Sequence, residues 1–290
     1  MQSFFNQSLK NISFQPAMKW SGSKRSQCNE IIKYFPKEID TYYEPFCGGC
    51  SMLYRLMVEP SIKVKRFIVS DINKDLILFW KTLKDDYKFL INGYTKLHNE
   101  FVELNQTEQK EYYKQVRERY NKNHNVVDFL FIMRTCYNGM PRYNSDGEFN
   151  NPVHPKRSGI EPDRLEKIFE DWSKLLKKKD VYFRDLPYWE TTTDINDFVY
   201  LDPPYANTKG MYFGNFNTPR FLEFLKYLNC KWIMSYDGSV SSERTNEDYS
   251  DNVPKELYTE KIMIKSGNSS FRRLNGDTIN NVDEALYIKR

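Results

Sequence analysis

An acid, two prolines and an aromatic ring follow a short apolar run in the second half of the chain, in the order Asp202-Pro203-Pro204-Tyr205. The run before them, residues 198–201, has the composition of a buried central strand. Prolines cannot donate to a sheet ladder, so the strand must end there. The sequence therefore predicts a carboxylate, a backbone carbonyl and a flat ring at the carboxyl edge of a sheet, where open α/β sheets bind ligands.

Such a corner has the groups that are needed to hold a planar amine, for example N6 of adenine. The Asp202 side chain and the Pro203 carbonyl can each accept one N–H, which localises the lone pair on nitrogen and aims it at an electrophile. Tyr205 can stack on the base, an interaction worth about 1–3 kcal/mol in stacking sites. The alternative is an ordinary strand followed by a proline turn with a capping acid. The other motifs of the chain favour the first interpretation.

Two further stretches have the spacing of a nucleotide-binding turn and its acid. Gly48 and Gly49 follow a predicted first strand at residues 42–46, and glycines there let the backbone approach a ligand closely. A predicted second strand, residues 67–71, ends in Asp71, roughly 20 residues after the glycines. This spacing suits a carboxylate that accepts hydrogen bonds from ribose hydroxyls. The alternative role of Asp71 is to cap the helix that follows.

Asp-Pro-Pro-Tyr after a buried strand is the signature of amino-methyltransferases that use S-adenosylmethionine, and other motifs resemble those of the Dam-type DNA adenine methyltransferases. These motifs are Lys19-Trp20-Ser21-Gly22-Ser23-Lys24, Glu44-Pro45-Phe46-Cys47-Gly48-Gly49-Cys50 and Asp71-Ile72-Asn73-Lys74-Asp75-Leu76. Cys50 stands where the family has a third glycine. The resemblance implies catalytic roles for Asp202, Pro203, Pro204 and Tyr205. It implies cofactor contacts by Trp20, Lys24, Glu44, Phe46, Gly48, Asp71 and Asp202.

A polar stretch near residues 137–150 is rich in Arg, Asn and Tyr, and its Asp-Gly dipeptide is the strongest short hairpin signal. Such a hairpin can enter a DNA groove, because Arg pairs with guanine, Asn with adenine, and Tyr can wedge between base steps. The alternative is a surface hairpin with an ordinary complement of polar residues. The stretch is similar to the family pattern N-G-x-x-R-x-N…G-E-F-N. This resemblance implies Tyr137 as an intercalating ring, Asn138 beside the base left unpaired by flipping, and Arg142 as a base reader.

Further DNA contacts are expected at Lys19, Asn144, Lys156 and Arg157. The counterpart of Lys19 contacts a base in the GATC-specific members of the family, whereas Lys156 and Arg157 are expected to contact phosphate, which positions the protein without specifying sequence. The GATC-reading members carry N-V-P-F-G-R downstream of the hairpin, and this chain has a different sequence at residues 151–159. That departure argues against GATC and leaves the recognition sequence open.

The composition fits a globular enzyme with a local nucleic-acid groove. The chain has 290 residues, 40% of them hydrophobic, and a formal net charge of only +4, unlike a histone-like polycation. Its five cysteines include one Cys-x-x-Cys pair without a second pair or a histidine cluster, so we expect no metal and reduced thiols in a cytoplasmic protein. No apolar run approaches the roughly 18 residues of a membrane span, so we expect a soluble protein without a membrane partner.

The order of the motifs, with the cofactor motifs first and Asp-Pro-Pro-Tyr after an insertion, is that of the alpha group of amino-methyltransferases and covers nearly the whole chain. It implies an α/β fold with a Rossmann-like, seven-stranded methyltransferase sheet. The catalytic domain is expected at residues 1–81 and 179–290, with a mostly helical target-recognition insertion at residues 82–178. The polar loop 206–218 has the composition of a segment that orders over substrate, and the basic loop 266–273 either tracks phosphate or is simply solvated.

The resemblance therefore implies site-specific transfer of a methyl group from S-adenosylmethionine to adenine N6 in double-stranded DNA, with base flipping and without a metal. Three alternatives remain: the same chemistry on cytosine N4 or an RNA adenine, an inactive DNA-binding regulator, and a Rossmann oxidoreductase. The intact Asp202 and Tyr205 argue against the regulator, and the proline-rich strand end argues against the oxidoreductase. The sequence leaves open the oligomeric state, a cognate restriction endonuclease, and the choice between restriction–modification, orphan and phage roles.

Overall fold

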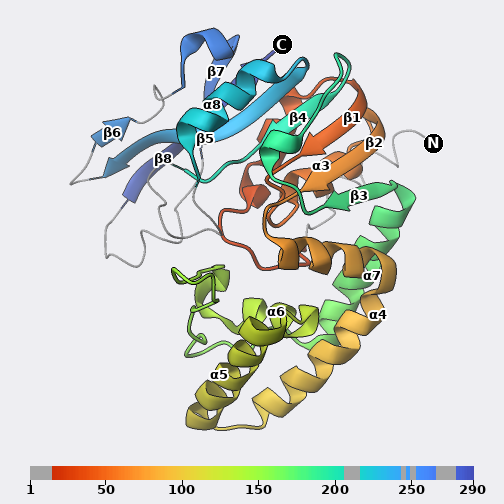
Figure 1. The fold of residues 1–290 in the computed structure, drawn as a ribbon, viewed down its shortest axis with the longest axis vertical. Helices are drawn as coiled ribbons and strands as arrows, with labels where there is room; N and C mark the ends of the chain where they lie inside the picture. The colour runs from red at the N-terminus through yellow and green to blue at the C-terminus, as the bar shows by residue number, and fades with distance from the viewer. Residues whose placement is uncertain (1–14, 206–215, 243–245, 249–252, 266–278) are drawn as a thin grey trace.

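A computed structural model describes residues 15–205, 216–242, 246–248, 253–265 and 279–290. The strands in this part of the chain form a single sheet (Figure 1). In chain order they are β1 (Glu38–Glu44), β2 (Lys63–Ser70), β3 (Val181–Arg184), β4 (Phe198–Leu201), β5 (Lys231–Ser242), β6 (Asn246–Asp248), β7 (Glu260–Lys265) and β8 (Ile279–Lys289).

The order across the sheet is β3-β2-β1-β4-β5-β8-β7, and β6 pairs with β5 outside this path. Neighbouring strands from β3 to β5 run parallel, whereas β8 lies antiparallel to both β5 and β7. The last strand in the sequence is thus inserted between two earlier strands. This seven-stranded path confirms the methyltransferase-like sheet that the motif order predicted.

The strand β4 lies near the centre of the sheet, and all four of its side chains are buried. Its neighbours are β1, where Tyr42 pairs with Phe198, and β5, where Met234 pairs with Leu201. A strand that is covered on both faces needs apolar side chains at every position, which explains its continuous apolar run. Because β4 ends at Leu201, the side chain of Asp202 follows directly at the carboxyl edge of the sheet.

Helices cover the sheet and form a lobe below it in the view of Figure 1. This lobe is the helical insertion between β2 and β3 that the sequence predicted. The α-helices are α2 (Cys28–Ile31), α3 (Ser51–Met57), α4 (Lys74–Val102), α5 (Gln106–Asn123), α6 (Val126–Thr135), α7 (Pro162–Lys178) and α8 (Thr218–Tyr227). The 3-10 helices are η1 (Lys24–Ser26), η2 (Ile32–Tyr34), η3 (Tyr137–Gly139), η4 (Tyr188–Glu190) and η5 (Lys255–Leu257).

The long helix α4 connects the sheet to the insertion. It begins after Asn73, whose side-chain oxygen accepts a 3.0 Å hydrogen bond from the backbone N–H of Leu76. The expected domain boundary at residue 82 falls inside this helix, which contains a single non-helical residue, Asp86, a few positions later. One hydrophobic core therefore continues from the sheet into the insertion.

The second half of α4 packs closely against α6. A Cβ atom at Gly93 of α4 would lie 2.6 Å from Cγ1 of Val127, so only glycine permits this approach. The first half packs on α7, where the rings of Trp80 and Trp172 have centroids 5.0 Å apart. These contacts fix the insertion relative to the carboxyl edge of the sheet.

Two predicted loops lie wholly or largely outside the described residues. They are the loop 206–218, of which 216–218 are described, and the loop 266–273. Within the part of the chain that is described, no helix is long and apolar enough to cross a membrane.

Candidate active site

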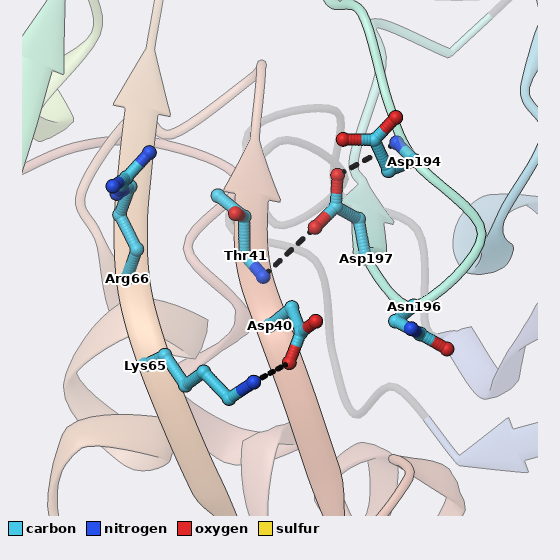
Figure 2. A pocket seen from close by; sticks show the side chains of 7 residues that line it. All are labelled: Asp40, Thr41, Lys65, Arg66, Asp194, Asn196 and Asp197. Carbon is cyan, nitrogen blue, oxygen red and sulfur yellow. Dashed lines mark hydrogen bonds and ion pairs between the residues drawn. The ribbon is translucent and has the colours of Figure 1, made fainter.

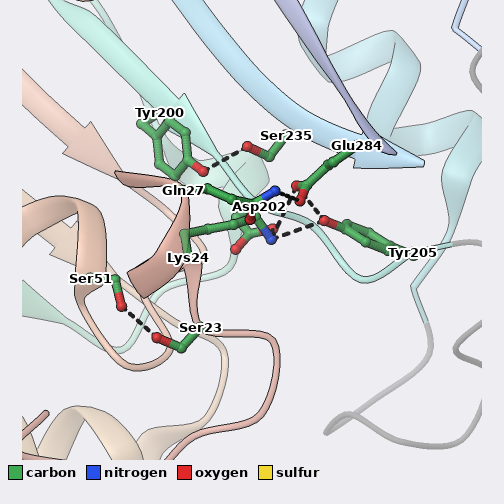
Figure 3. A network of polar contacts seen from close by, with 9 residues as sticks. All are labelled: Ser23, Lys24, Gln27, Ser51, Tyr200, Asp202, Tyr205, Ser235 and Glu284. Carbon is green, nitrogen blue, oxygen red and sulfur yellow. Dashed lines mark hydrogen bonds and ion pairs between the residues drawn. The ribbon is translucent and has the colours of Figure 1, made fainter. Parts of the chain in front are cut away.

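The carboxyl end of β4 brings Asp202 against a lysine from the N-terminal region, as Figure 3 shows. Lys24 Nζ lies 2.7 Å from Oδ1 of Asp202 and 3.2 Å from Oε1 of Glu284, and it donates a 2.9 Å hydrogen bond to the hydroxyl of Tyr205. The Tyr205 hydroxyl donates in turn to Oε1 of Glu284. Gln27 Nε2 donates a 2.6 Å hydrogen bond to the other oxygen of the same carboxylate. Two carboxylates therefore share one ammonium group.

The three charged side chains of this network differ in exposure. Those of Lys24 and Glu284 are 7% and 6% exposed, whereas that of Asp202 is 19% exposed. Burial raises the pKa of Asp202, Lys24 lowers it, and Glu284 raises it again, with a net upward shift. The ion pair with Lys24 is made by Oδ1 of Asp202, and no described residue donates a hydrogen bond to Oδ2.

The ring of Tyr205 is held in place on more than one side. The Lys24 ammonium lies 5.1 Å from its centroid, and Tyr236 of β5 meets it edge-on at 6.1 Å. Behind this corner, the hydroxyls of Tyr200 and Ser235 form a buried 2.8 Å hydrogen bond between β4 and β5. Pro203 is buried and Pro204 half-buried, so the motif leaves the sheet as a tightly packed segment.

The predicted glycine turn lies after β1 and is in contact with Trp20. Gly48 has a positive φ of 45°, and a Cβ atom there would lie 2.9 Å from Nε1 of Trp20. Its carbonyl accepts a 3.0 Å hydrogen bond from Nε1 of Trp80, and its N–H donates a 3.1 Å hydrogen bond to Oδ2 of Asp71. The turn is therefore held by the indoles of Trp20 and Trp80 and by Asp71, which follows the end of β2.

Asp71 does not cap α4, because Asn73 occupies the cap position. The other carboxylate oxygen of Asp71, Oδ1, accepts a 3.0 Å hydrogen bond from the backbone N–H of Asn73. Each carboxylate oxygen has two lone pairs, so Asp71 retains capacity for two further donors, such as a pair of ribose hydroxyls. Burial raises the pKa of Asp71 to about 6.

The structure explains what the third glycine of the family pattern does and how this chain replaces it. Cys50 occupies that position in a left-handed conformation, with φ of 53°, and its N–H donates a 2.7 Å hydrogen bond to the carbonyl of Cys47. Both thiols are buried. Burial raises the pKa of each, to about 11 for Cys50, so they remain protonated at neutral pH.

The other two predicted cofactor residues lie at the end of β1. Glu44 is buried and accepts a 2.8 Å hydrogen bond from the hydroxyl of Tyr42, and burial raises its pKa to about 8. Phe46 stacks on Tyr188 with centroids 5.2 Å apart and meets the edge of Phe221. Glu44 is thus a polar position, whereas Phe46 belongs to an aromatic cluster beside β4.

Several predicted DNA-binding residues lie together on the insertion. The ring of Tyr137 stacks on His154, with centroids 5.3 Å apart and planes 17° apart. Asn138 and Gly139 both have positive φ angles, 56° and 63°, which form a tight Asn-Gly turn. A Cβ atom at Gly139 would lie 2.6 Å from Cγ of Lys19, so the lysine packs directly on this turn.

The predicted base reader Arg142 is exposed and bound to one neighbour. Its Nε and Nη2 donate hydrogen bonds of 2.8 and 2.9 Å to the side-chain and backbone oxygens of Asn150. Asn144 has a different setting: its oxygen accepts from the N–H groups of Asp146 and Glu148, and its Nδ2 donates to the Glu148 carboxylate. The Asn144 side chain thus closes the hairpin turn, while Arg142 is oriented with its remaining N–H groups outward.

The basic residues Lys156 and Arg157 are exposed and are separated from His154 by Pro155 alone. The N–H of Lys156 donates a 3.1 Å hydrogen bond to Nδ1 of His154, which places the ring proton on Nε2. Burial, followed by the charges of Arg157, Lys19 and Lys156, lowers the pKa of this histidine. At neutral pH the ring stacked on Tyr137 is therefore uncharged.

Three residues near these sites lie outside the motifs that the sequence revealed: Gln27, His154 and Glu284. For Glu284 the signal was weak, because it is the second of two adjacent acids, Asp283 and Glu284, before the apolar run 285–288. For His154 the signal was its position in the stretch that departs from the GATC-reading pattern. Gln27 has no comparable signal.

A separate hollow of about 450 Å³ lies at the opposite, amino-terminal edge of β1 and β2 (Figure 2). Lys65 and Asp40 form a 2.6 Å ion pair there. Asp197 accepts hydrogen bonds of 2.9 Å from the N–H of Thr41 and 2.8 Å from the N–H of Asp194. These contacts hold the entry to β4 beside β1 and lie away from the residues that the motifs identified.

Comparison with known proteins agrees with the motifs. Residues 20–270 match the family described as D12 class N6 adenine-specific DNA methyltransferase. The type II methyltransferase M.MjaIII of Methanocaldococcus jannaschii is 37% identical over 230 residues, which are 73% of this chain and 74% of that protein. The type II methyltransferase M.CviBI of Paramecium bursaria Chlorella virus NC1A is 28% identical over 275 residues, 87% of this chain and 99% of that protein.

A DNA adenine methylase of Haemophilus influenzae is 28% identical over 207 residues, 69% of this chain and 67% of that protein. Among solved structures, the rRNA methyltransferase aviRa from Streptomyces viridochromogenes aligns with 97% of this chain and 92% of its own, at 11% identity and a TM-score of 0.43. That likeness is too low to add to the sequence matches.

Proposed function

Because this chain belongs to the D12 class of N6-adenine-specific DNA methyltransferases, we propose that Asp202, the Pro203 carbonyl and Tyr205 hold the amine of an adenine flipped out of duplex DNA. The chain is a site-specific DNA methyltransferase that acts on adenine N6, and the family implies S-adenosylmethionine as the methyl donor. The observation that carries the proposal is the partly exposed Asp202 carboxylate after the end of β4, which shares the Lys24 ammonium with the hydroxyl of Tyr205.

The residues at the glycine turn fit the cofactor. Gly48 gives a close backbone approach beside the Trp20 indole, and Asp71 retains lone pairs for two hydroxyl donors. Glu44 and Phe46 would complete the site at the end of β1, with Lys24 between this turn and Asp202. When bound there, S-adenosylmethionine supplies a methyl group on a sulfonium, which is already a strong electrophile, so we propose a reaction without a metal.

The protein's own contribution is to orient the amine and to manage its proton. Asp202 Oδ2 and the Pro203 carbonyl each accept one N–H, which leaves the nitrogen lone pair directed away from them. Tyr205 stacks on the base, and the Lys24 ammonium keeps the Asp202 carboxylate ionised against the effect of burial. The methylated amine must lose one proton, and the Asp202 carboxylate that holds the amine is a base that can receive it. Positioning of this kind can supply a large part of the rate enhancement.

We propose that the insertion, at about residues 82–178, recognises the target sequence, and that residues 1–81 and 179–290 form the catalytic domain. The exposed basic residues of the insertion, Lys156 and Arg157 among them, would bind DNA phosphates and release counterions. The affinity for DNA should therefore fall steeply with salt concentration. Tyr137 would intercalate, and its stacking on His154 supports this proposal because it keeps the ring in a fixed orientation. Asn138 and Lys19 would face the adjacent bases, and Arg142 would read one of them.

The experiment that tests this function is sequencing with detection of modified bases, on DNA from cells that lack their own adenine methylation and express this chain. We expect N6-methyladenine at one short sequence, and we expect none with Asp202→Ala, whose binding to duplex DNA should persist. Modification of cytosine N4, or full turnover by Asp202→Ala, would contradict the proposal. The same data give the recognition sequence and decide whether it is GATC.

The relatives M.MjaIII and M.CviBI are named type II methyltransferases, which supports a restriction–modification role with a cognate endonuclease for this chain. We accordingly propose that it acts in the cytoplasm of a bacterial or phage-infected cell. Digestion of unmethylated and methylated DNA with extracts of the source cells tests the role. Cleavage of only the unmethylated DNA at the recognition sequence supports it, and equal survival of both DNAs contradicts it.

A further inference from the structure

Glu284 is a buried carboxylate to which the proposed reaction assigns no role. It lies on β8, opposite Ile264 of β7, and its neighbours Ala285 and Leu286 are fully buried. Its polar contacts with described residues all lead to the catalytic corner: Lys24 Nζ at 3.2 Å, Gln27 Nε2 at 2.6 Å and the hydroxyl of Tyr205. A buried carboxylate is costly unless it is paired, and this one is paired with groups of the candidate site.

The geometry shows what Glu284 does to Lys24. A lysine ammonium is a compact charge that can bind either oxygen of a nearby carboxylate. Here it lies between two carboxylates, and on Asp202 it contacts Oδ1 at 2.7 Å. Without Glu284, the same ammonium would be free to centre on Asp202 and cover both of its oxygens. Glu284 therefore keeps Oδ2 of Asp202 open to a substrate amine.

The second effect of Glu284 concerns the ring that stacks on the base. Among the described residues, the hydroxyl of Tyr205 accepts a hydrogen bond from Lys24 and donates one to Glu284, so this pair directs the hydroxyl. Gln27 holds the carboxylate from the other side. The orientation of the Tyr205 ring at the corner thus depends on a residue that is not itself in contact with the proposed substrate.

We propose that Glu284 is a positioning residue for methyl transfer, which acts through Lys24 and the Tyr205 hydroxyl to keep one oxygen of Asp202 open and the Tyr205 ring aligned. This inference rests on the proposed function of the corner. It adds Glu284, which lies on β8 and outside the recognised motifs, to the residues on which turnover depends.

The electrostatics give the inference a distinctive readout. The groups that act on or are affected by Asp202 are Lys24 from η1, Glu284 from β8, Glu44 from β1, and Tyr200 and Tyr205 from β4 and the segment after it. Burial and Glu284 raise the pKa of Asp202, and Lys24 lowers it. Glu284→Gln removes a negative charge and leaves Asp202 as the one carboxylate paired with Lys24 among the described residues. Both changes lower the pKa of Asp202, so the acid limb of the kcat–pH profile should move to lower pH.

The test compares Glu284→Gln with Glu284→Asp. The matched control is Glu260→Gln on the neighbouring strand β7, because the ion pair of Glu260 with Arg290 is exposed. Turnover is measured on duplex DNA from pH 5 to 9, and binding of S-adenosylhomocysteine is measured by calorimetry. For Glu284→Gln we expect unchanged binding, a kcat reduced about 10- to 100-fold, the scale of an ångström-level misplacement, and an acid limb at lower pH. Glu284→Asp should restore the wild-type acid limb and part of the turnover.

Wild-type turnover and an unmoved acid limb in Glu284→Gln would overturn the inference. So would loss of S-adenosylhomocysteine binding in both variants, because that result would assign Glu284 a structural role. Full turnover by Asp202→Ala is a separate result, which would contradict the proposed function of the corner itself. With Asp202→Ala inactive and Glu284→Gln unaffected, only the inference about Glu284 fails.

Discussion

The side-chain amide of Asn73 donates a 2.9 Å hydrogen bond to the hydroxyl of Tyr143. Tyr143 belongs to the hairpin of the insertion and pairs with Phe149 in an antiparallel bridge. Asn73 also caps α4 with its side-chain oxygen and donates its backbone N–H to Asp71. One asparagine therefore joins the hairpin proposed to read DNA to the acid proposed to bind the cofactor.

We expect Tyr143→Phe to lower the free energy of unfolding by about 1–2 kcal/mol, because it leaves the buried Asn73 amide without this acceptor. Urea denaturation monitored by fluorescence provides the measurement. The matched control is Tyr112→Phe, since Tyr112 bonds to Glu100 at the exposed surface, and it should change stability by less than about 0.5 kcal/mol. Equal effects of the two substitutions would show that the Asn73–Tyr143 bond has no special weight.

Arg142→Ala should relax the sequence preference at one base by about 1–3 kcal/mol, since the exposed guanidinium is oriented by Asn150 with N–H groups to spare. The measurement is methylation of a duplex library with randomised positions around the target adenine. Lys156→Ala serves as the comparison, because a phosphate contact should weaken binding to all sequences alike and reduce the salt slope by about one. If Arg142→Ala also loses affinity uniformly, another residue reads the base.

The pH dependence of stability should carry the signature of Glu44. Burial raises its pKa from 4.5 to about 8 in the folded protein, so the folded state binds a proton that the unfolded chain has already lost over this interval. The free energy of unfolding should therefore fall as pH rises from about 4.5 to 8, by up to about 1.4 kcal/mol per pH unit from this group. Above the folded pKa, the cost of the ionised Glu44 is fully present.

Glu44→Gln removes this contribution while its amide oxygen can still accept from Tyr42. We expect the variant to gain stability relative to the wild type as pH rises from 5 to 8, measured by urea denaturation at several pH values. Stability curves that run parallel through this range would mean that Glu44 is ionised without penalty in the folded protein.

The motifs predicted the centre of the molecule well because their signals are local. An apolar run ended by prolines fixes β4 and Asp202, and the glycine turn and Asp71 follow from their spacing along the chain. The expected boundary at residue 82 falls within α4, a long helix that begins after Asn73 and leads from the sheet into the insertion. Asn144 illustrates a different limit, since its type suits DNA contact while its amide is bonded within the hairpin turn.

Glu284 could not be assigned to the site from sequence, because its role depends on contacts between distant parts of the chain. Its partner Gln27 is 257 positions away. The pairing arises only because β8 inserts between β5 and β7 and brings the acid to the corner that β4 and η1 form. The apolar run 285–288 has the strand propensity of β8, but propensity contains no information about which strands lie beside it.

The position of β8 also sets the order in which the protein is completed on the ribosome. In the described sheet β7 has β8 as its sole neighbour, although β7 is synthesised first, so it must wait for β8 before it can pair. The Trp20–Gly48 turn and the hairpin are made long before that moment. The polar network around Asp202 therefore cannot form before β8 has been synthesised, and until then a nascent chain lacks a finished catalytic corner.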